Sequence, residues 1–111
     1  MNGLENLKQA LLLRFLTPVG ELTKLGHPNY GSRLFKLIGE LNTETNRNRA
    51  KLFVLQALAT EPRVKKVLTV NVTQNQRDRT QMDIEISLEV GDNDTVLNLV
   101  FPFFLEGGPI P

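Results

Sequence analysis

The sequence contains no cysteine and no tryptophan, and His27 is the only histidine among its 111 residues. Without cysteine the chain forms no disulfide scaffold, zinc ribbon or thiol nucleophile, and one histidine does not make a transition-metal site. Phosphate-binding glycine loops and nucleophile elbows are also missing. No apolar run approaches the ~18 residues of a membrane span, and residues 1–5 do not read as a signal peptide. We therefore expect no metal, no cofactor and no direct membrane insertion.

Charges of the two signs are unevenly distributed along the chain. Residues 1–80 hold all 13 Lys and Arg and six acids, for a net charge of +7, whereas residues 81–111 hold six acids and no base. Two explanations stay open: ion pairs inside the molecule, or neighbours of opposite sign in an assembly. Binding of nucleic acid is not expected, because acids are interspersed among the bases and aromatic residues make up only 6% of the chain.

Apolar periodicity predicts a helix at the N-terminus. Asn2 and Glu5 have the spacing of a capping box, and the helical pattern continues to Leu16. The apolar side chains on one face are Leu4, Leu7, Leu11 and Phe15. Three more widen this face, namely Leu12, Leu13 and Leu16. We therefore expect neighbouring elements to cover this helix on more than one side.

A second long helix is predicted to end near Thr60. Asn42 or Thr43 is the expected N-cap, and Pro62 stops the helix because the residue before a proline is driven out of the α region. The apolar residues expected to form its buried stripe are Leu52, Phe53, Leu55, Leu58 and Ala59.

The stretch between the two helices is rich in glycine and proline, which break it into turns. An extended piece is expected at 21–25. A short helix is expected at 32–38 and ends at Gly39, with three side chains pointing inward: Leu34, Leu37 and Ile38.

The second half of the chain alternates apolar and polar residues with a period of two, which is typical of strands. The predicted strands are 64–74, 80–90 and 95–104. A register that aligns their apolar faces can be written for both hairpins. In the first hairpin it pairs Val72 with Met82, Val70 with Ile84 and Leu68 with Ile86. In the second hairpin it pairs Leu97 with Leu88, Leu99 with Ile86, Phe101 with Ile84 and Phe103 with Met82. Lys66 opposite Leu88 is the one misfit, and on the other face Lys65 lies opposite Glu89.

Together these elements predict an α+β fold, with two main helices packed on one face of an antiparallel meander. The meander has three strands, with a four-stranded sheet as the alternative. The length lies below the ~150 residues typical of a domain, so we expect residues 1–106 to form a single domain. The closing Gly-Gly-Pro-Ile-Pro at 107–111 is expected to be a flexible tail.

Paired carboxylates are the one enzymatic arrangement that this composition leaves open, because glycoside hydrolysis needs two acids about 5–10 Å apart. Asp83 and Glu85 are alternate residues of a predicted strand, and such side chains lie roughly 7 Å apart on one face. An exposed sheet face, however, offers no pocket that desolvates one of the acids. We favour a solvated strand face and predict no catalytic residue.

Glu61, Pro62 and Arg63 lie between the second helix and the sheet. A glutamate at a helix C-terminus opposes the helix dipole, at a cost of about 0.3–1 kcal/mol. One interpretation is an ordinary helix stop with a surface ion pair. The other is a stiff, charged corner that contacts a partner protein.

The last predicted strand is apolar on both faces. Its core face carries Leu97, Leu99, Phe101 and Phe103, and its other face carries Val96, Asn98, Val100, Pro102 and Phe104. An edge strand of this kind invites pairing or packing by another chain, although Pro102 limits free pairing there. Alternatively, the first helix or the segment at 21–25 covers that side.

Several stretches taken together resemble one protein family. They are LTPVGEL at 16–22, LGHPNYGSRL at 25–34, ALATEPRV at 57–64 and LNLVFPF at 97–103. Over nearly the whole chain, and in this order, they resemble the GPW-type baseplate wedge family of contractile phage tails and related injection systems, which includes the type VI secretion component TssE. The most specific part is the Tyr-Gly-Ser turn followed by Glu-Pro-Arg at a helix-to-strand junction.

The resemblance implies a structural, non-enzymatic subunit of a baseplate, present in six copies around the tail tube of a particle that is assembled in the cytoplasm. Members of this family act as sheath initiators, to which arms of sheath subunits add strands. In this chain that implies a sheath contact at Val96, Asn98, Val100, Pro102 and Phe104. The family's Glu-Pro-Arg loop faces the core bundle of the baseplate wedge, which implies a wedge contact at Glu61, Pro62 and Arg63.

The partners that the resemblance implies are therefore sheath subunits, baseplate wedge proteins and the tail tube. Some phage members carry a lysozyme label, so a small peptidoglycan-cleaving enzyme that uses Asp83 and Glu85 is one alternative. A stand-alone regulatory adaptor of the same fold is another.

Overall fold

The computed structural model describes residues 3–91 and 95–106. Its elements are α1 (Gly3–Leu16), the short 3-10 helices η1 (Thr23–Leu25) and η2 (Leu34–Leu37), α2 (Glu44–Leu58), and the strands β1 (Val64–Gln74), β2 (Gln81–Val90) and β3 (Thr95–Phe104). None of the helices in these residues is long and apolar enough to cross a membrane.

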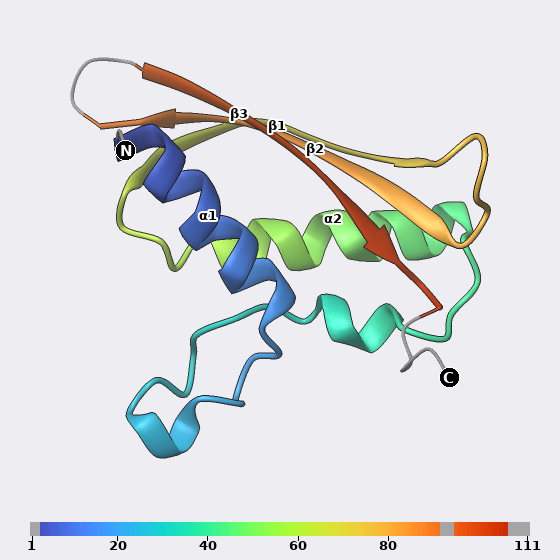
Figure 1. The fold of residues 1–111 in the computed structure, drawn as a ribbon, viewed down its shortest axis with the longest axis horizontal. Helices are drawn as coiled ribbons and strands as arrows, with labels where there is room; N and C mark the ends of the chain where they lie inside the picture. Colours follow the sequence, from blue (N-terminus) through green and yellow to red (C-terminus); the bar gives the residue numbers. More distant parts are fainter. Residues whose placement is uncertain (1–2, 92–94, 107–111) are drawn as a thin grey trace.

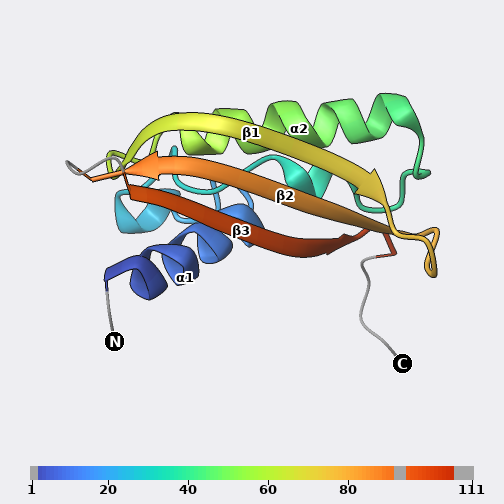
Figure 2. The same cartoon turned by 90° about the horizontal axis from the view of Figure 1, so that it is seen from above.

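The three strands form one antiparallel sheet in the order β1-β2-β3. Figures 1 and 2 show α1 and α2 on the same face of this sheet, with the other face uncovered by any helix of the described chain. The predicted α+β fold of two helices on a three-stranded meander is therefore confirmed. Within residues 3–91 and 95–106 a fourth strand is absent, and Pro18 and Ser32 form only an isolated bridge. The tail predicted at 107–111 lies outside the described residues.

Helix α1 is buried on one side only. Leu7, Leu11 and Phe15 are at most 4% exposed, whereas Leu13 and Leu16 are 62% and 60% exposed. The prediction that neighbouring elements cover this helix on more than one side is therefore wrong for Leu13 and Leu16, although α1 contacts β3, η2 and α2 along its buried side. Of the predicted capping pair, Asn2 lies outside the described residues.

Helix α2 starts where the sequence predicts. The Thr43 hydroxyl accepts a hydrogen bond from the Asn46 N–H at 3.1 Å and caps the helix. The buried side chains are Ala50, Phe53, Val54, Ala57 and Leu58. Leu52 is 52% exposed and Ala59 is exposed, so the predicted stripe is displaced by part of a turn. Two of these buried residues, Ala50 and Ala57, are small.

The connection between the helices folds as turns and 3-10 helices. The extended piece predicted at 21–25 is wrong, because η1 forms there and ends at Gly26 in a left-handed conformation with φ of 87°. Gly31 has φ of 113°, and a Cβ at this position would collide with the Thr17 carbonyl oxygen. In η2, Leu34 and Leu37 are fully buried as predicted, but Ile38 is 46% exposed.

The hairpin of β2 and β3 has the predicted register along its whole length, including Leu99 opposite Ile86 and Phe101 opposite Ile84. The hairpin of β1 and β2 differs: Val72 lies opposite Ile84 and not Met82, a slip of two residues. Such a slip keeps every side chain on its predicted face, so the apolar pattern does not detect it.

Two irregularities then bring β1 back toward the predicted register at its start. They lie between Val67 and Thr69 and between Val64 and Lys66. As a result Leu68 is 41% exposed, where the prediction had placed it in the core. The irregularities also place Lys66 opposite Glu89, which removes the predicted misfit with Leu88.

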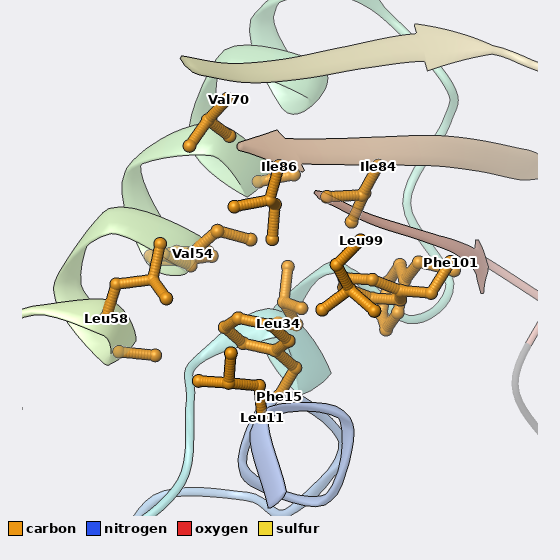
Figure 3. Close-up of a cluster of buried hydrophobic side chains, with 14 of the residues drawn as sticks. Leu11, Phe15, Leu34, Val54, Leu58, Val70, Ile84, Ile86, Leu99 and Phe101 are labelled. Atoms are coloured by element: carbon orange, nitrogen blue, oxygen red, sulfur yellow. The ribbon is translucent and has the colours of Figure 1, made fainter. Parts of the chain in front are cut away.

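The core lies between the helices and the inner face of the sheet. Figure 3 shows side chains of α1, η2 and α2 meeting those of all three strands. Phe15 of α1 stacks on Phe101 of β3 with ring centroids 5.2 Å apart. Each large apolar side chain buried here contributes about 1.5–3 kcal/mol to folding. This packing fixes the position of β3 and leaves its other face outward.

Candidate protein-binding site

The carboxylate of Glu61 lies at the centre of a buried charge cluster, just beyond the end of α2. Its side chain is only 3% exposed, and its two oxygens lie 2.9 Å from Nη2 of Arg14 and 2.7 Å from Nε of Arg63. The hydrogen bond from the Arg63 side chain lowers the pKa of the Glu61 carboxyl below its ordinary 4.5, while burial opposes this shift. Two arginines therefore neutralise the charge that would otherwise oppose the helix dipole.

Arg14 joins this cluster to other parts of the chain. Its Nη1 donates a hydrogen bond of 2.8 Å to the Thr60 hydroxyl, and its guanidinium lies 4.7 Å from the centroid of the Tyr30 ring. The arginine side chain is 11% exposed. The cluster thus connects α1, the loop that contains Tyr30, the end of α2 and the start of β1. We call it the Glu61 corner.

The three residues predicted to contact a wedge protein differ in exposure at the Glu61 corner. Glu61 points inward, so the interpretation as a surface ion pair is wrong for its carboxylate. Pro62 is exposed, and the Arg63 side chain is 51% exposed. Both line an open hollow together with Gly3, Leu7, Lys65, Val90 and Gly91. The corner therefore presents an exposed proline and an exposed arginine, and the buried glutamate holds the arginine in place.

Sequence reasoning missed Arg14, Thr60 and Tyr30 as members of this cluster. A signal for Arg14 exists, because it follows Leu11 by three residues and so lies beside the buried face of α1. An arginine at such a position needs a carboxylate nearby when it is buried. Nothing in the local sequence shows that the carboxylate belongs to Glu61.

The outward side chains of β3 remain exposed. Val96 and Phe104 are 50% exposed and Val100 is 65% exposed, while Asn98 accepts a hydrogen bond of 2.7 Å from the Ser87 hydroxyl. Neither α1 nor η1 covers this face, since the helices lie on the opposite face of the sheet. Among the described strands, β3 pairs only with β2, so its other edge is free. We call the face formed by Val96, Asn98, Val100, Pro102 and Phe104 the β3 outer face.

Asp83 and Glu85 project from β2 on the same side of the sheet. Asp83 accepts hydrogen bonds from the side-chain amides of Gln81 at 2.8 Å and Asn75 at 3.0 Å, and Glu85 is exposed. A glycosidase acid is usually held in an apolar pocket. Neither carboxylate has such surroundings here.

Other candidate ligands are scattered. His27 is exposed in the loop after η1. In the part of the chain that the structure describes, no three side chains of His, Cys, Asp or Glu are grouped so that they could hold a metal ion.

The segregated charges are joined at one place in the described chain. Lys65 lies 3.5 Å from Glu89 and links the basic part to the acidic part, although Lys66, and not Lys65 as predicted, is the register partner of Glu89. The pairs of Glu61 lie within the basic part. Among the described residues, ion pairs across the two parts therefore involve one acid of β2, Glu89, while Glu85 is exposed.

Comparison with protein-family models gives one match. The family model described as "Baseplate wedge protein gp25" matches residues 2–95. Among solved structures, a protein from Geobacter sulfurreducens with the provisional description of a tail lysozyme superposes with a TM-score of 0.81 at 23% identity, over 98% of this chain and 96% of that chain. At this identity the likeness shows the fold alone. The search of curated proteins gave no match.

Proposed function

Since this chain belongs to the family of the baseplate wedge protein gp25, we propose that it is a structural, non-enzymatic subunit of a phage-tail-like contractile baseplate. In this role it links the baseplate wedge to the first sheath ring, and strands of sheath subunits add to its sheet. Six copies surround the tail tube. The observation that carries the proposal is the free edge of β3, whose outward residues stay exposed and apolar.

The free edge of β3 suits the addition of a strand. A proline within a sheet is tolerated where its missing N–H would face away from the neighbouring strand. Backbone groups alternate in direction along a strand, so the even-numbered residues of β3, among them Asn98 and Val100, direct their N–H and C=O groups to the same free edge as Pro102. These groups are available to a partner strand.

Pro62 and Arg63 form the contact with the baseplate wedge, and Glu61 acts on it indirectly. The carboxylate fixes Arg63 through Nε at 2.7 Å, which leaves part of the guanidinium exposed. A fixed arginine loses less side-chain entropy when it binds an acidic partner group. All three predicted residues thus contribute, with the glutamate as a positioning residue.

Replacement of Val100 by proline tests strand addition. Val100→Pro removes one backbone donor at the free edge, and Val100→Ala keeps it while shortening the same side chain. In a particle-forming system we expect Val100→Pro to lower the yield of sheathed particles about tenfold or more, and Val100→Ala to stay near wild type. Electron microscopy and sedimentation measure the yield. Normal sheaths on folded Val100→Pro subunits would refute strand addition at this edge.

Purified protein on peptidoglycan tests the enzymatic alternative. We expect no release of soluble fragments, because Glu85 is exposed and Asp83 is held by two amides. Turnover that disappears in Asp83→Asn would overturn the non-enzymatic assignment.

A further inference from the structure

The outer face of the sheet carries two neighbouring stripes of different chemistry. Across β2 and β3 the register pairs Glu89 with Val96, Ser87 with Asn98, Glu85 with Val100, Asp83 with Pro102 and Gln81 with Phe104. Residues directly opposite each other on antiparallel strands lie about 4.5–5.5 Å apart. An acidic stripe on β2 therefore runs beside the apolar β3 outer face.

The apolar stripe is unusual for a solvated sheet. The water-facing side of an antiparallel sheet is normally polar, and exposed apolar patches indicate binding surfaces. On β3, however, Val96, Val100 and Phe104 are all at least half exposed. Folding of this chain therefore leaves an apolar surface to be covered by something else.

Part of the acidic stripe carries negative charge that no ion pair among the described residues neutralises. Glu85 is exposed and forms none of the ion pairs found among the described residues. The amide donors on Asp83 leave its charge in place. Glu89, by contrast, is paired with Lys65. The charge available to a partner is therefore centred on Asp83 and Glu85, beside Val100.

We propose that the outer face of the sheet binds an amphipathic helix of a partner protein. The apolar stripe of this helix packs on Val96, Val100 and Phe104, and a flank of Lys or Arg faces Asp83 and Glu85. This inference rests on the proposed role as an assembly subunit, but it concerns a different surface from the free edge of β3.

A helix fits this surface better than a strand does. A strand added at the edge pairs with backbone groups and leaves the outward side chains of β3 uncovered. The distance along β3 from Val96 to Phe104 is about 26 Å, which matches a helix of about 18 residues. Since α1 and α2 already cover the inner face (Figure 2), a helix on the outer face completes a three-layer arrangement.

Binding of synthetic peptides to the isolated chain tests this inference. Three peptides of about 18 residues share one leucine stripe and carry Lys, Gln or Glu along the flank. We expect the Lys peptide to bind at least about tenfold more tightly than the Gln peptide, and the Glu peptide not to bind. Amide NMR signals of β2 and β3 should shift, whereas those of η1 and η2 should not.

Two charge variants provide a matched control. Glu85→Lys and Glu21→Lys each replace an exposed acid by a base, and Glu21 lies outside the sheet. We expect Glu85→Lys to weaken binding of the Lys peptide about tenfold and Glu21→Lys to change it less than about twofold. Equal losses in both variants would overturn the proposal, because the attraction would then depend on net charge alone.

Two further outcomes would also overturn it. Self-association of the chain that Val100→Asp abolishes would make a second copy the occupant of this face. Binding of an extended peptide of alternating Val and Lys, with no binding of the helical Lys peptide, would assign the surface to a strand. This last outcome would leave strand addition intact, whereas normal sheaths on Val100→Pro subunits would refute strand addition and leave the helix site untouched.

Discussion

The Glu61 corner and the β3 outer face both contain residues expected to bind partners, but folding satisfies them to different degrees. At the corner, two arginines form ion pairs with the carboxylate of Glu61, and this residue is only 5% exposed. On the face, Val100 stays 65% exposed because no element of the described chain reaches it. The long side chain of an arginine elsewhere in the chain can reach a carboxylate and neutralise it. An apolar side chain on the outward face of a strand, by contrast, cannot turn to the core, because the backbone fixes its direction. Exposed apolar side chains therefore indicate a partner more strongly than a charged turn does.

The largest difference between the two regions is expected when Glu61 is removed. Glu61→Ala leaves Arg14 buried without a counter-charge and should lower the free energy of unfolding by about 2–4 kcal/mol, somewhat below a fully buried pair because Arg63 is half exposed. Urea unfolding measures the change. Glu40→Ala, which removes an exposed acid, serves as the control and should stay within about 0.5 kcal/mol of wild type. Equal effects of both variants would contradict the corner's role in stability.

Acid should weaken the corner and leave the face unaffected. The Arg63 side chain holds the pKa of Glu61 below 4.5 in the folded state. The contribution of this carboxylate is therefore complete above the unfolded-state pKa and is lost as the pH falls through the folded-state pKa. Below about pH 4.5 the wild type should lose stability more steeply than Glu61→Gln. Urea unfolding across this range compares the two proteins, and parallel curves would show that Glu61 titrates alike in both states.

The smallest effect is expected on the β3 outer face. Val100→Lys should change the free energy of unfolding by less than about 0.5 kcal/mol, because the side chain already lies in water. Its neighbour Leu99 points to the core at 6% exposure, and Leu99→Ala should cost about 2–5 kcal/mol. Thermal and urea unfolding of both variants measure this contrast. A large loss of stability in Val100→Lys would mean that the monomer itself uses this face.

The two hairpins show how far periodicity predicts a sheet. Both faces of β3 and the inner face of β2 are strongly patterned, and their register was predicted correctly. In β1, Leu68 was assigned to the core because it continues the alternation from Val70 and Val72. The irregularity after Val67 breaks that alternation, and no local signal marks it. The wrong assignment of Leu68 to the core therefore arises at the irregularity after Val67 in β1.

The helices show a similar limit. The N-cap at Thr43 and the buried residues Leu7, Leu11 and Phe15 of α1 follow from local chemistry, and the structure agrees with these. Leu4, which was expected on the same face of α1, is 37% exposed. The choice between Leu52 and Ala50 for the buried face of α2 depends on how the helix is rotated about its axis when it packs on the sheet. The small residue is buried and the large one is exposed, which hydrophobicity alone does not predict.

The candidate residues divide in the same way. The outward position of Val96, Val100 and Phe104 was predicted, because alternation along a strand assigns faces directly. The inward position of Glu61 was not, since its partner Arg14 lies 47 residues away.

By itself, the sequence determined the order of the two main helices and the three strands, the single-sheet fold and the face of β3 that points outward. These features depend on short-range periodicity and on residues that begin and end helices. Only the tertiary structure decided that ion pairs inside the molecule neutralise the Glu61 carboxylate. It also decided that the acids of β2 lie beside an apolar stripe that the described chain leaves uncovered. Ion pairs between distant segments arise when packed elements bring the side chains together, and packing depends on the volume and shape of the whole core.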